Sequence, residues 1–226
     1  CVELGSGDSA IRPVDGVSLA INKGETYALL GESGCGKSMT ALSILRLLPQ
    51  PIGHITSGRV LLGNEELTAL PESEMRRISG RRISMIFQEP MTSLNPVLTV
   101  GDQIAEVLRQ HHGMKGRVAQ DRVLELLDAV GIPDARRRFR EYPHQLSGGM
   151  KQRVMISIAL AGEPDLLIAD EPTTALDVTI QAQVLELVQQ LQQDTHRAIL
   201  LITHDLGIVA GMADRVGVLY AGQLVE

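Results

Sequence analysis

The chain has 226 residues and a net charge of −6, with 44% hydrophobic and 21% charged residues, a composition typical of a globular protein with a buried core. The net negative charge, together with an aromatic content of only 2%, argues against a nucleic-acid partner, which calls for basic surfaces and stacking rings. The only cysteines, Cys1 and Cys35, are too few for a disulfide framework or a metal-ligand cluster. No apolar run approaches the ~20 residues of a membrane-spanning helix.

The first part of the chain alternates between strand and helix patterns. Residues 26–30 predict a buried strand, and residues 37–48 predict a helix that ends before Pro49 and Pro51. Residues 57–67 predict a hairpin that turns at Gly63 and Asn64. Residues 81–88 predict a strand that ends at Gln88.

The pattern between residues 89 and 162 is helical, with helices expected at 101–109, 117–130 and 148–161. Strands at 165–170 and 198–203 then alternate with helices at 177–193, where Asp177 is the expected N-cap, and 205–213. A final strand from residue 215 enters a hairpin. This order predicts one α/β domain with a mostly parallel sheet and N-terminal antiparallel strands. Its core comprises residues 1–88 and 163–226, and the helical subdomain is inserted at 89–162.

The sequence GESGCGKS at residues 31–38 fits the phosphate-binding pattern G-x-x-x-x-G-K-[ST] and lies between a strand and a helix, as that pattern requires. Lys37 supplies a charge to the β- and γ-phosphates, and the Ser38 hydroxyl can ligate Mg²⁺. The bland alternative is a glycine-rich turn that binds nothing, and Cys35 is either a small filler or a reactive thiol at a helix N-terminus. The nucleotide-binding residues expected here are Gly31, Glu32, Ser33, Gly34, Cys35, Gly36, Lys37, Ser38 and Met39.

Four polar side chains lie at or just after the ends of predicted strands, at the edge where parallel sheets bind ligands. Asp170 ends LLIAD and is expected to hold Mg²⁺, while Glu171 is expected to polarise the attacking water. His204 follows LIT and can contact the γ-phosphate or align the water with Glu171. Gln88 can contact Mg²⁺ or the water. The alternative for Glu171 and His204 is that each is an exposed strand-end group.

The sequence LSGGMKQRV at residues 146–154 predicts a second helix that begins with phosphate-binding chemistry. A helix N-terminus presents free N–H groups and the positive end of a dipole. Ser147 is the expected N-cap, and Gly148 and Gly149 complete the anion-binding end. One chain therefore carries two helix ends suited to phosphate.

Together these motifs resemble the nucleotide-binding subunit of ABC transporters. GESGCGKS is similar to Walker A, Gln88 to the Q-loop residue, LSGGMKQR to the family signature, LLIADEP to Walker B, TALD at 174–177 to the D-loop and His204 to the switch histidine. FQEPMTSLNPVLTVGDQI and YPHQLSGGMKQRVMIS further resemble the peptide and nickel importer branch. Leu4 stands where the family usually has an adenine-stacking aromatic residue, which puts base selectivity in question.

The resemblance implies an ATPase that uses ATP and Mg²⁺ to energise import of peptides or a related small solute. It implies head-to-tail pairing with a second copy or a related subunit, so that the signature of one chain caps ATP held by the other. Further implied partners are membrane permeases and, indirectly, a solute-binding protein, at the cytoplasmic face of the inner membrane.

The resemblance also suggests where the permease docks and how the chain continues. Glu89, Met91 and Leu94 are expected to line a permease-docking groove, although the two apolar residues could instead fill the helical core. A C-terminal extension is expected beyond residue 226. The alternatives are an ABC ATPase that remodels a macromolecule without transport, and a binding module without catalysis, which the presence of Glu171 and His204 disfavours.

Overall fold

The computed structural model describes residues 1–5, 7, 10–174 and 177–226, and only the backbone of residues 90, 91, 191 and 194. Its main element is a six-stranded sheet in which only the terminal β10–β11 pair is antiparallel. The strands lie in the order β11 (Gln223–Leu224), β10 (Arg215–Tyr220), β3 (Thr26–Leu30), β9 (Ala198–Ile202), β8 (Leu166–Asp170) and β7 (Ile83–Ile86).

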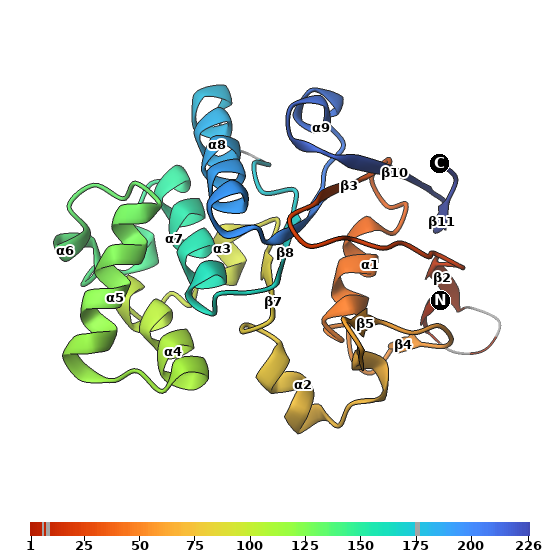
Figure 1. Cartoon of the computed structure of the whole chain (residues 1–226), viewed down its shortest axis with the longest axis horizontal. Coiled ribbons are helices and arrows are strands. Elements are labelled where there is room, and N and C mark those ends of the chain that lie inside the picture. Colours follow the sequence, from red (N-terminus) through yellow and green to blue (C-terminus); the bar gives the residue numbers. More distant parts are fainter. Residues whose placement is uncertain (6, 8–9, 175–176) are drawn as a thin grey trace.

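Alternate residues of the parallel strands face two different helical layers, because side chains along a strand point to opposite faces. Leu167 and Ala169 of β8 pack with α4, α5, α7 and α8, whereas Ile168 between them packs with α1. Figure 1 shows α7 and α8 on one side of the strands and α1 on the other. These helices are α1 (Lys37–Ile44), α4 (Val100–His112), α5 (Gly116–Ala129), α7 (Gly148–Ala161) and α8 (Val178–Thr195).

Short antiparallel strands form a separate layer near the N-terminus. The β2–β1–β4 sheet and the β5–β6 hairpin belong to it. Their bounds are β1 (Val2–Leu4), β2 (Ile11–Val14), β4 (Gly53–Ile55), β5 (Leu61–Leu62) and β6 (Glu65–Glu66). A short 3₁₀ helix at Leu67–Ala69 and α2 (Glu72–Ile78) then lead to β7. The predicted fold class, an α/β domain with a mostly parallel sheet and N-terminal antiparallel strands, is confirmed.

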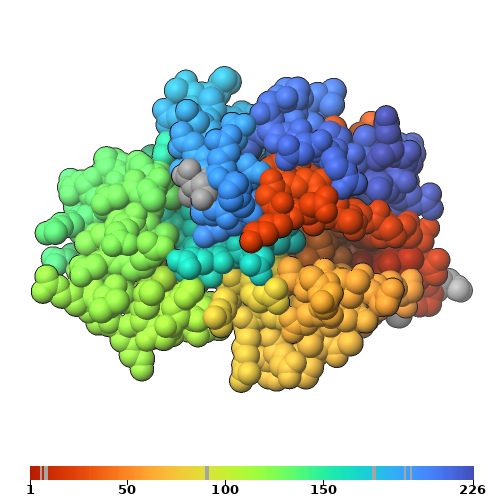
Figure 2. Space-filling model, viewed as in Figure 1, coloured from red at the N-terminus to blue at the C-terminus, as the bar shows by residue number. Residues whose placement is uncertain are grey.

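The chain between β7 and β8 is helical, although these two strands are neighbours in the sheet. Besides α4, α5 and α7 it contains α3 (Pro90–Ser93), α6 (Ala135–Arg138) and a 3₁₀ helix at Pro143–Gln145. Figure 2 shows the green surface of this region gathered at one end of the molecule. Its apolar residues share a single core with one face of the sheet. The subdomain limits at 89 and 162 stay a prediction.

Several predicted boundaries differ from the structure. The helix expected to reach residue 48 ends at Ile44. Arg46 adopts a left-handed conformation (φ 56°), and the amide of Leu47 donates to the Leu42 carbonyl, so the helix ends before the prolines that were expected to end it. The strand expected to reach Gln88 ends at Ile86, and α4 is longer than predicted. The helices at 148–161 and 178–195 begin at the expected caps Ser147 and Asp177. The last helix is α9 (Leu206–Met212).

The described residues include no helix that is both long enough and apolar enough to cross a membrane.

Candidate functional site

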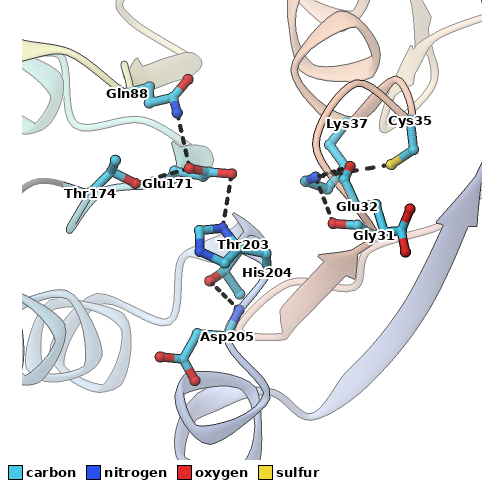
Figure 3. Close-up of polar contacts among 10 residues, drawn as sticks. All are labelled: Gly31, Glu32, Cys35, Lys37, Gln88, Glu171, Thr174, Thr203, His204 and Asp205. Atoms are coloured by element: carbon cyan, nitrogen blue, oxygen red, sulfur yellow. Dashed lines mark hydrogen bonds and ion pairs between the residues drawn. The ribbon is translucent and has the colours of Figure 1, made fainter.

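The predicted site residues gather at one edge of the parallel sheet because β3, β9, β8 and β7 all end there. The loop at residues 31–36 follows β3, Glu171 follows β8 and His204 follows β9 by two residues. The Glu171 amide donates to the Ile202 carbonyl (2.9 Å), which ties the ends of β8 and β9 together. Figure 3 shows these side chains and their contacts.

Lys37 is folded into the phosphate-type loop and is only 5% exposed. Its Nζ donates to the carbonyls of Gly31 and Glu32, both at 2.8 Å (Figure 3). Burying an ammonium group is costly unless it is paired, and these carbonyls are dipoles rather than counter-ions. The loop therefore holds a positive charge that an anionic ligand would satisfy better.

Gly36 and Cys35 allow the loop to pack closely against neighbouring segments. Gly36 has φ 109°, and a Cβ there would lie 1.9 Å from the Pro13 carbonyl oxygen. Cys35 is buried, and its Sγ lies 3.9 Å from Lys37 Nζ. A Cβ on Gly31 would lie 2.5 Å from that sulfur, which agrees with the prediction that Cys35 is a small filler.

We expect Gly36→Ala to lower the free energy of unfolding by about 3 kcal/mol, because it combines a disfavoured φ with a backbone clash. Gly34→Ala is the matched control. Gly34 also has positive φ (81°), but nothing lies within 4 Å of its added Cβ, so the loss should be about 1 kcal/mol. Urea unfolding of both variants tests this, and equal losses would contradict the close approach to Pro13.

The carboxylate of Asp170 lies beside Ser38 and fits a hard cation. Burial raises the pKa of Asp170, and a hydrogen bond with Ser38 and the charge of Lys37 offset this only in part. Asp170 Oδ1 is buried and has no hydrogen-bond partner among the described residues. A hydroxyl and a carboxylate are the oxygen ligands that Mg²⁺ prefers. These two residues therefore fit a magnesium site.

Glu171 is held by three side chains from different segments and is 14% exposed. Gln88 Nε2 and Thr174 Oγ1 each donate to Glu171 Oε2 at 2.9 Å. His204 Nδ1 lies 3.2 Å from the other oxygen, Oε1. The four residues form the cluster drawn in Figure 3.

The pKa of Glu171 is lowered despite its partial burial. Burial raises the pKa, but the hydrogen bonds with Thr174 and His204 and the electrostatic attraction of His204 and Lys37 together outweigh it. The ionised form is the one that can accept a proton from water. This environment therefore keeps Glu171 in the protonation state that a general base requires.

The signature sequence begins α7 on the other face of the sheet from α1. Ser147 Oγ accepts from the amide of Met150 (3.4 Å), as predicted for an N-cap. Ser147 and Gly148 are exposed, and a Cβ on Gly149 would lie 2.9 Å from Ile180 Cγ2. The two phosphate-suited helix ends of one chain thus belong to opposite layers.

Two residues of the site were missed by the sequence analysis. Thr174 was seen only as part of the D-loop motif, although its position three residues after Glu171 in a turn is a signal that could have found it. Gln152 of α7 is 2% exposed and donates through Nε2 to the Pro172 carbonyl, which holds the segment after Glu171. Nothing in the sequence pattern indicates that contact.

Other predicted residues have less defined surroundings. Gln88 donates its amide to Glu171, so its contact with Mg²⁺ stays a prediction. Met39 packs with the cluster of Val2, Val14 and Leu48, while Glu32, Ser33 and Gly34 are exposed and Leu4 is half-buried. Within the D-loop motif, residues 175 and 176 lie outside the described residues.

The expectation that Leu94 lines a docking groove is wrong. Leu94 is 3% exposed and belongs to the core shared by the helices and the sheet. The alternative for this residue, that it fills the helical core, is therefore the one observed. Glu89 is exposed, and the side chain of Met91 lies outside the described part of the chain.

The chain is similar in sequence to a known protein family and to proteins of that family. The family model described as ABC transporter matches residues 14–174. The dipeptide transport ATP-binding protein DppD of Bacillus subtilis is 57% identical over 216 residues, which cover 96% of this chain and 64% of the relative. The oligopeptide transport ATP-binding protein AppD of the same organism is 59% identical over 216 residues, with 96% and 66% covered. The chain thus spans about two thirds of their length.

A solved structure is also similar. The ATP-binding cassette MJ0796, in a dimeric post-hydrolysis state bound to ADP and Pi, has a TM-score of 0.85 at 31% identity and covers 100% of this chain and 97% of that chain. The chain belongs to the ABC transporter family. Its P-loop NTPase fold is that of the family's ATP-binding cassettes.

Proposed function

We propose that this chain binds and hydrolyses ATP and thereby energises import of peptides or a related small solute through membrane permeases. The observation that carries the proposal is an ionised, three-point-held Glu171 at the same sheet edge as a loop with a buried Lys37. Support for the solute class comes from relatives whose names state dipeptide or oligopeptide transport.

Each site residue has a separate role in the proposed reaction. The Lys37 ammonium leaves the carbonyls of Gly31 and Glu32 for the more negative phosphate oxygens. Glu171 accepts a proton from the attacking water, and His204 keeps its carboxylate oriented. Gln88 lies on the segment that leads into the helical region, so a change at the γ-phosphate could reach those helices through it.

Ser38 and Asp170 would hold Mg²⁺, with Gln88 as a further predicted ligand. When bound, the ion supplies positive charge that stabilises the phosphate oxygens. The support is the buried, unpartnered Asp170 Oδ1 described above.

Two copies of the chain, or this chain and a related subunit, are proposed to complete each site. Because α1 and α7 pack on opposite faces of the sheet, the signature end of α7 is available to ATP held by another chain. Ser147 and Gly148 are exposed, as such a contact requires. The MJ0796 cassette, whose structure is dimeric, supports this arrangement.

The catalytic proposal is tested by phosphate release from the purified chain with MgATP. Glu171→Gln should lower the rate at least ~100-fold, because the amide cannot accept the proton. A parental rate in this variant would overturn the role given to Glu171.

A hollow between α4, α5 and α6 is the proposed docking place for a permease segment at the cytoplasmic face of the membrane. It has a volume of about 890 Å³. Its apolar wall consists of Ala105, Met114, Ala119, Leu124 and Phe139. Its rim carries five basic residues against two acidic ones: Arg109, Lys115, Arg117, Arg136, Arg140, Asp102 and Asp121.

The rim charges indicate what the hollow would accept. Arg117 pairs with Asp121 (3.8 Å), but the other four basic groups make no ion pair with any described side chain. An amphipathic helix with acidic residues beside its apolar face complements such a surface.

We expect Arg136→Glu combined with Arg140→Glu to reduce uptake of a labelled peptide about tenfold or more in cells with the complete transporter, because the rim would repel an acidic segment. ATP hydrolysis by the isolated chain should stay unchanged. The matched control, Arg76→Glu with Arg77→Glu on α2, should leave uptake normal. Normal uptake by the first variant would exclude this hollow as the docking place.

A further inference from the structure

Thr174 has a closer structural relation to Glu171 than either of the other two side chains around that carboxylate. Its Oγ1 donates to Glu171 Oε2 (2.9 Å), and its backbone amide donates to the Glu171 carbonyl (3.1 Å). Gln88 and His204, by contrast, come from the segments after β7 and β9. Thr174 is therefore fixed to the same turn as Glu171.

The turn itself is unusual. Glu171 has φ 44°, a conformation that L residues other than glycine seldom adopt, so neighbouring contacts must maintain it. Its amide is bound by the Ile202 carbonyl, and the Pro172 carbonyl is bound by Gln152. The backbone of the turn is thus held from β9 and α7, and within the turn the Thr174 hydroxyl bonds the Glu171 carboxylate.

Gln88 and Thr174 donate to the same oxygen of Glu171, Oε2, but only Thr174 belongs to the same turn as Glu171. Under the proposed function, Gln88 turns toward the γ-phosphate or Mg²⁺ and its hydrogen bond to Glu171 is lost. Without a second donor, Oε2 would then have no hydrogen bond, and the carboxylate would be held only through Oε1 by His204. The Thr174 hydroxyl remains within reach because it moves with the turn.

We propose that Thr174 is a positioning residue that keeps the Glu171 carboxylate oriented toward the attacking water after the hydrogen bond from Gln88 is lost. This inference rests on the proposed function. It predicts that loss of the hydroxyl affects the chemical step and leaves nucleotide binding intact, because Thr174 makes no hydrogen bond to the loop at residues 31–38 in the described part of the chain.

The test compares Thr174→Val, Thr174→Ser and Thr173→Val. Valine keeps the shape of threonine without the hydroxyl, serine restores the hydroxyl, and Thr173→Val removes a neighbouring hydroxyl that makes no hydrogen bond to Glu171. We expect Thr174→Val to lower kcat about tenfold with KM for ATP unchanged, as for loss of one hydrogen bond to a charged group. Thr174→Ser and Thr173→Val should both retain kcat within about twofold. An unchanged kcat in Thr174→Val, or a loss that serine does not restore, would overturn the proposal.

Crystal structures of Thr174→Val and Thr174→Ser give a readout that does not depend on hydrolysis. The Glu171 carboxylate should turn away from its parental orientation in the valine variant and keep it in the serine variant. The same orientation in both would refute the positioning role. If the unaltered chain released no phosphate from MgATP, the proposed function would fail, while these structures would still decide whether Thr174 positions Glu171.

Discussion

Lys37→Ala is expected to lower ATP hydrolysis by at least ~100-fold and to weaken ATP binding, because the loop loses its only inward-pointing cation among the described residues 31–38. The alanine leaves the carbonyls of Gly31 and Glu32 without their present donor. Little else should change, since the backbone of the loop is fixed by Gly36 and by its strand and helix.

Phosphate release and calorimetric ATP titration measure the two effects. Lys23→Ala removes an exposed lysine from the same part of the chain and should behave as the parent. If Lys37→Ala hydrolysed ATP at the parental rate, the assignment of residues 31–38 as the phosphate loop would be wrong.

Glu171→Gln is expected to bind ATP and form a stable dimer. The variant keeps Lys37 and the signature end of α7 but lacks the carboxylate that accepts the proton, so ATP is not consumed and continues to bridge two chains. A ligand that binds only the paired form shifts the population toward it.

Light scattering with and without ATP measures the molar mass of this variant. Glu106→Gln changes an exposed carboxylate on α4 and should remain monomeric after ATP is consumed. A monomer for Glu171→Gln at saturating ATP would count directly against pairing by this chain with itself.

The features that the sequence predicted best are those that local chemistry determines. Ser147 and Asp177 were expected as N-caps, and each accepts a hydrogen bond from the third residue of its helix, Met150 and Ile180. Fold class was also predictable, because strands and helices alternate along the chain.

The features that were missed depend on where distant segments meet. Arg46 donates to the carbonyls of Leu67 and Leu70, contacts made by the segment just after the helix ends at Ile44. Leu94 is buried by helices that come later in the chain. No local pattern contains either partner, so periodicity alone could not place them.

The cluster around Glu171 also combines features that local sequence predicts with contacts between distant segments. Asp170, Glu171 and His204 were predicted because each lies at or just after the end of a buried strand. The hydrogen bond between Gln88 and Glu171 joins residues 83 positions apart. Its existence follows from the β7–β8 pairing, which the sequence order does not specify.

The central claim is that each ATP site combines the phosphate loop of one chain with the signature of another. Two variants, both in the Glu171→Gln background, divide these parts: the first adds Lys37→Ala and keeps only the signature, and the second adds Ser147→Arg and keeps only the loop. Sedimentation velocity with ATP should show each variant alone as a monomer and their mixture as a dimer with one complete site. A mixture that stays monomeric while Glu171→Gln alone dimerises, or either variant dimerising by itself, would contradict the composite site.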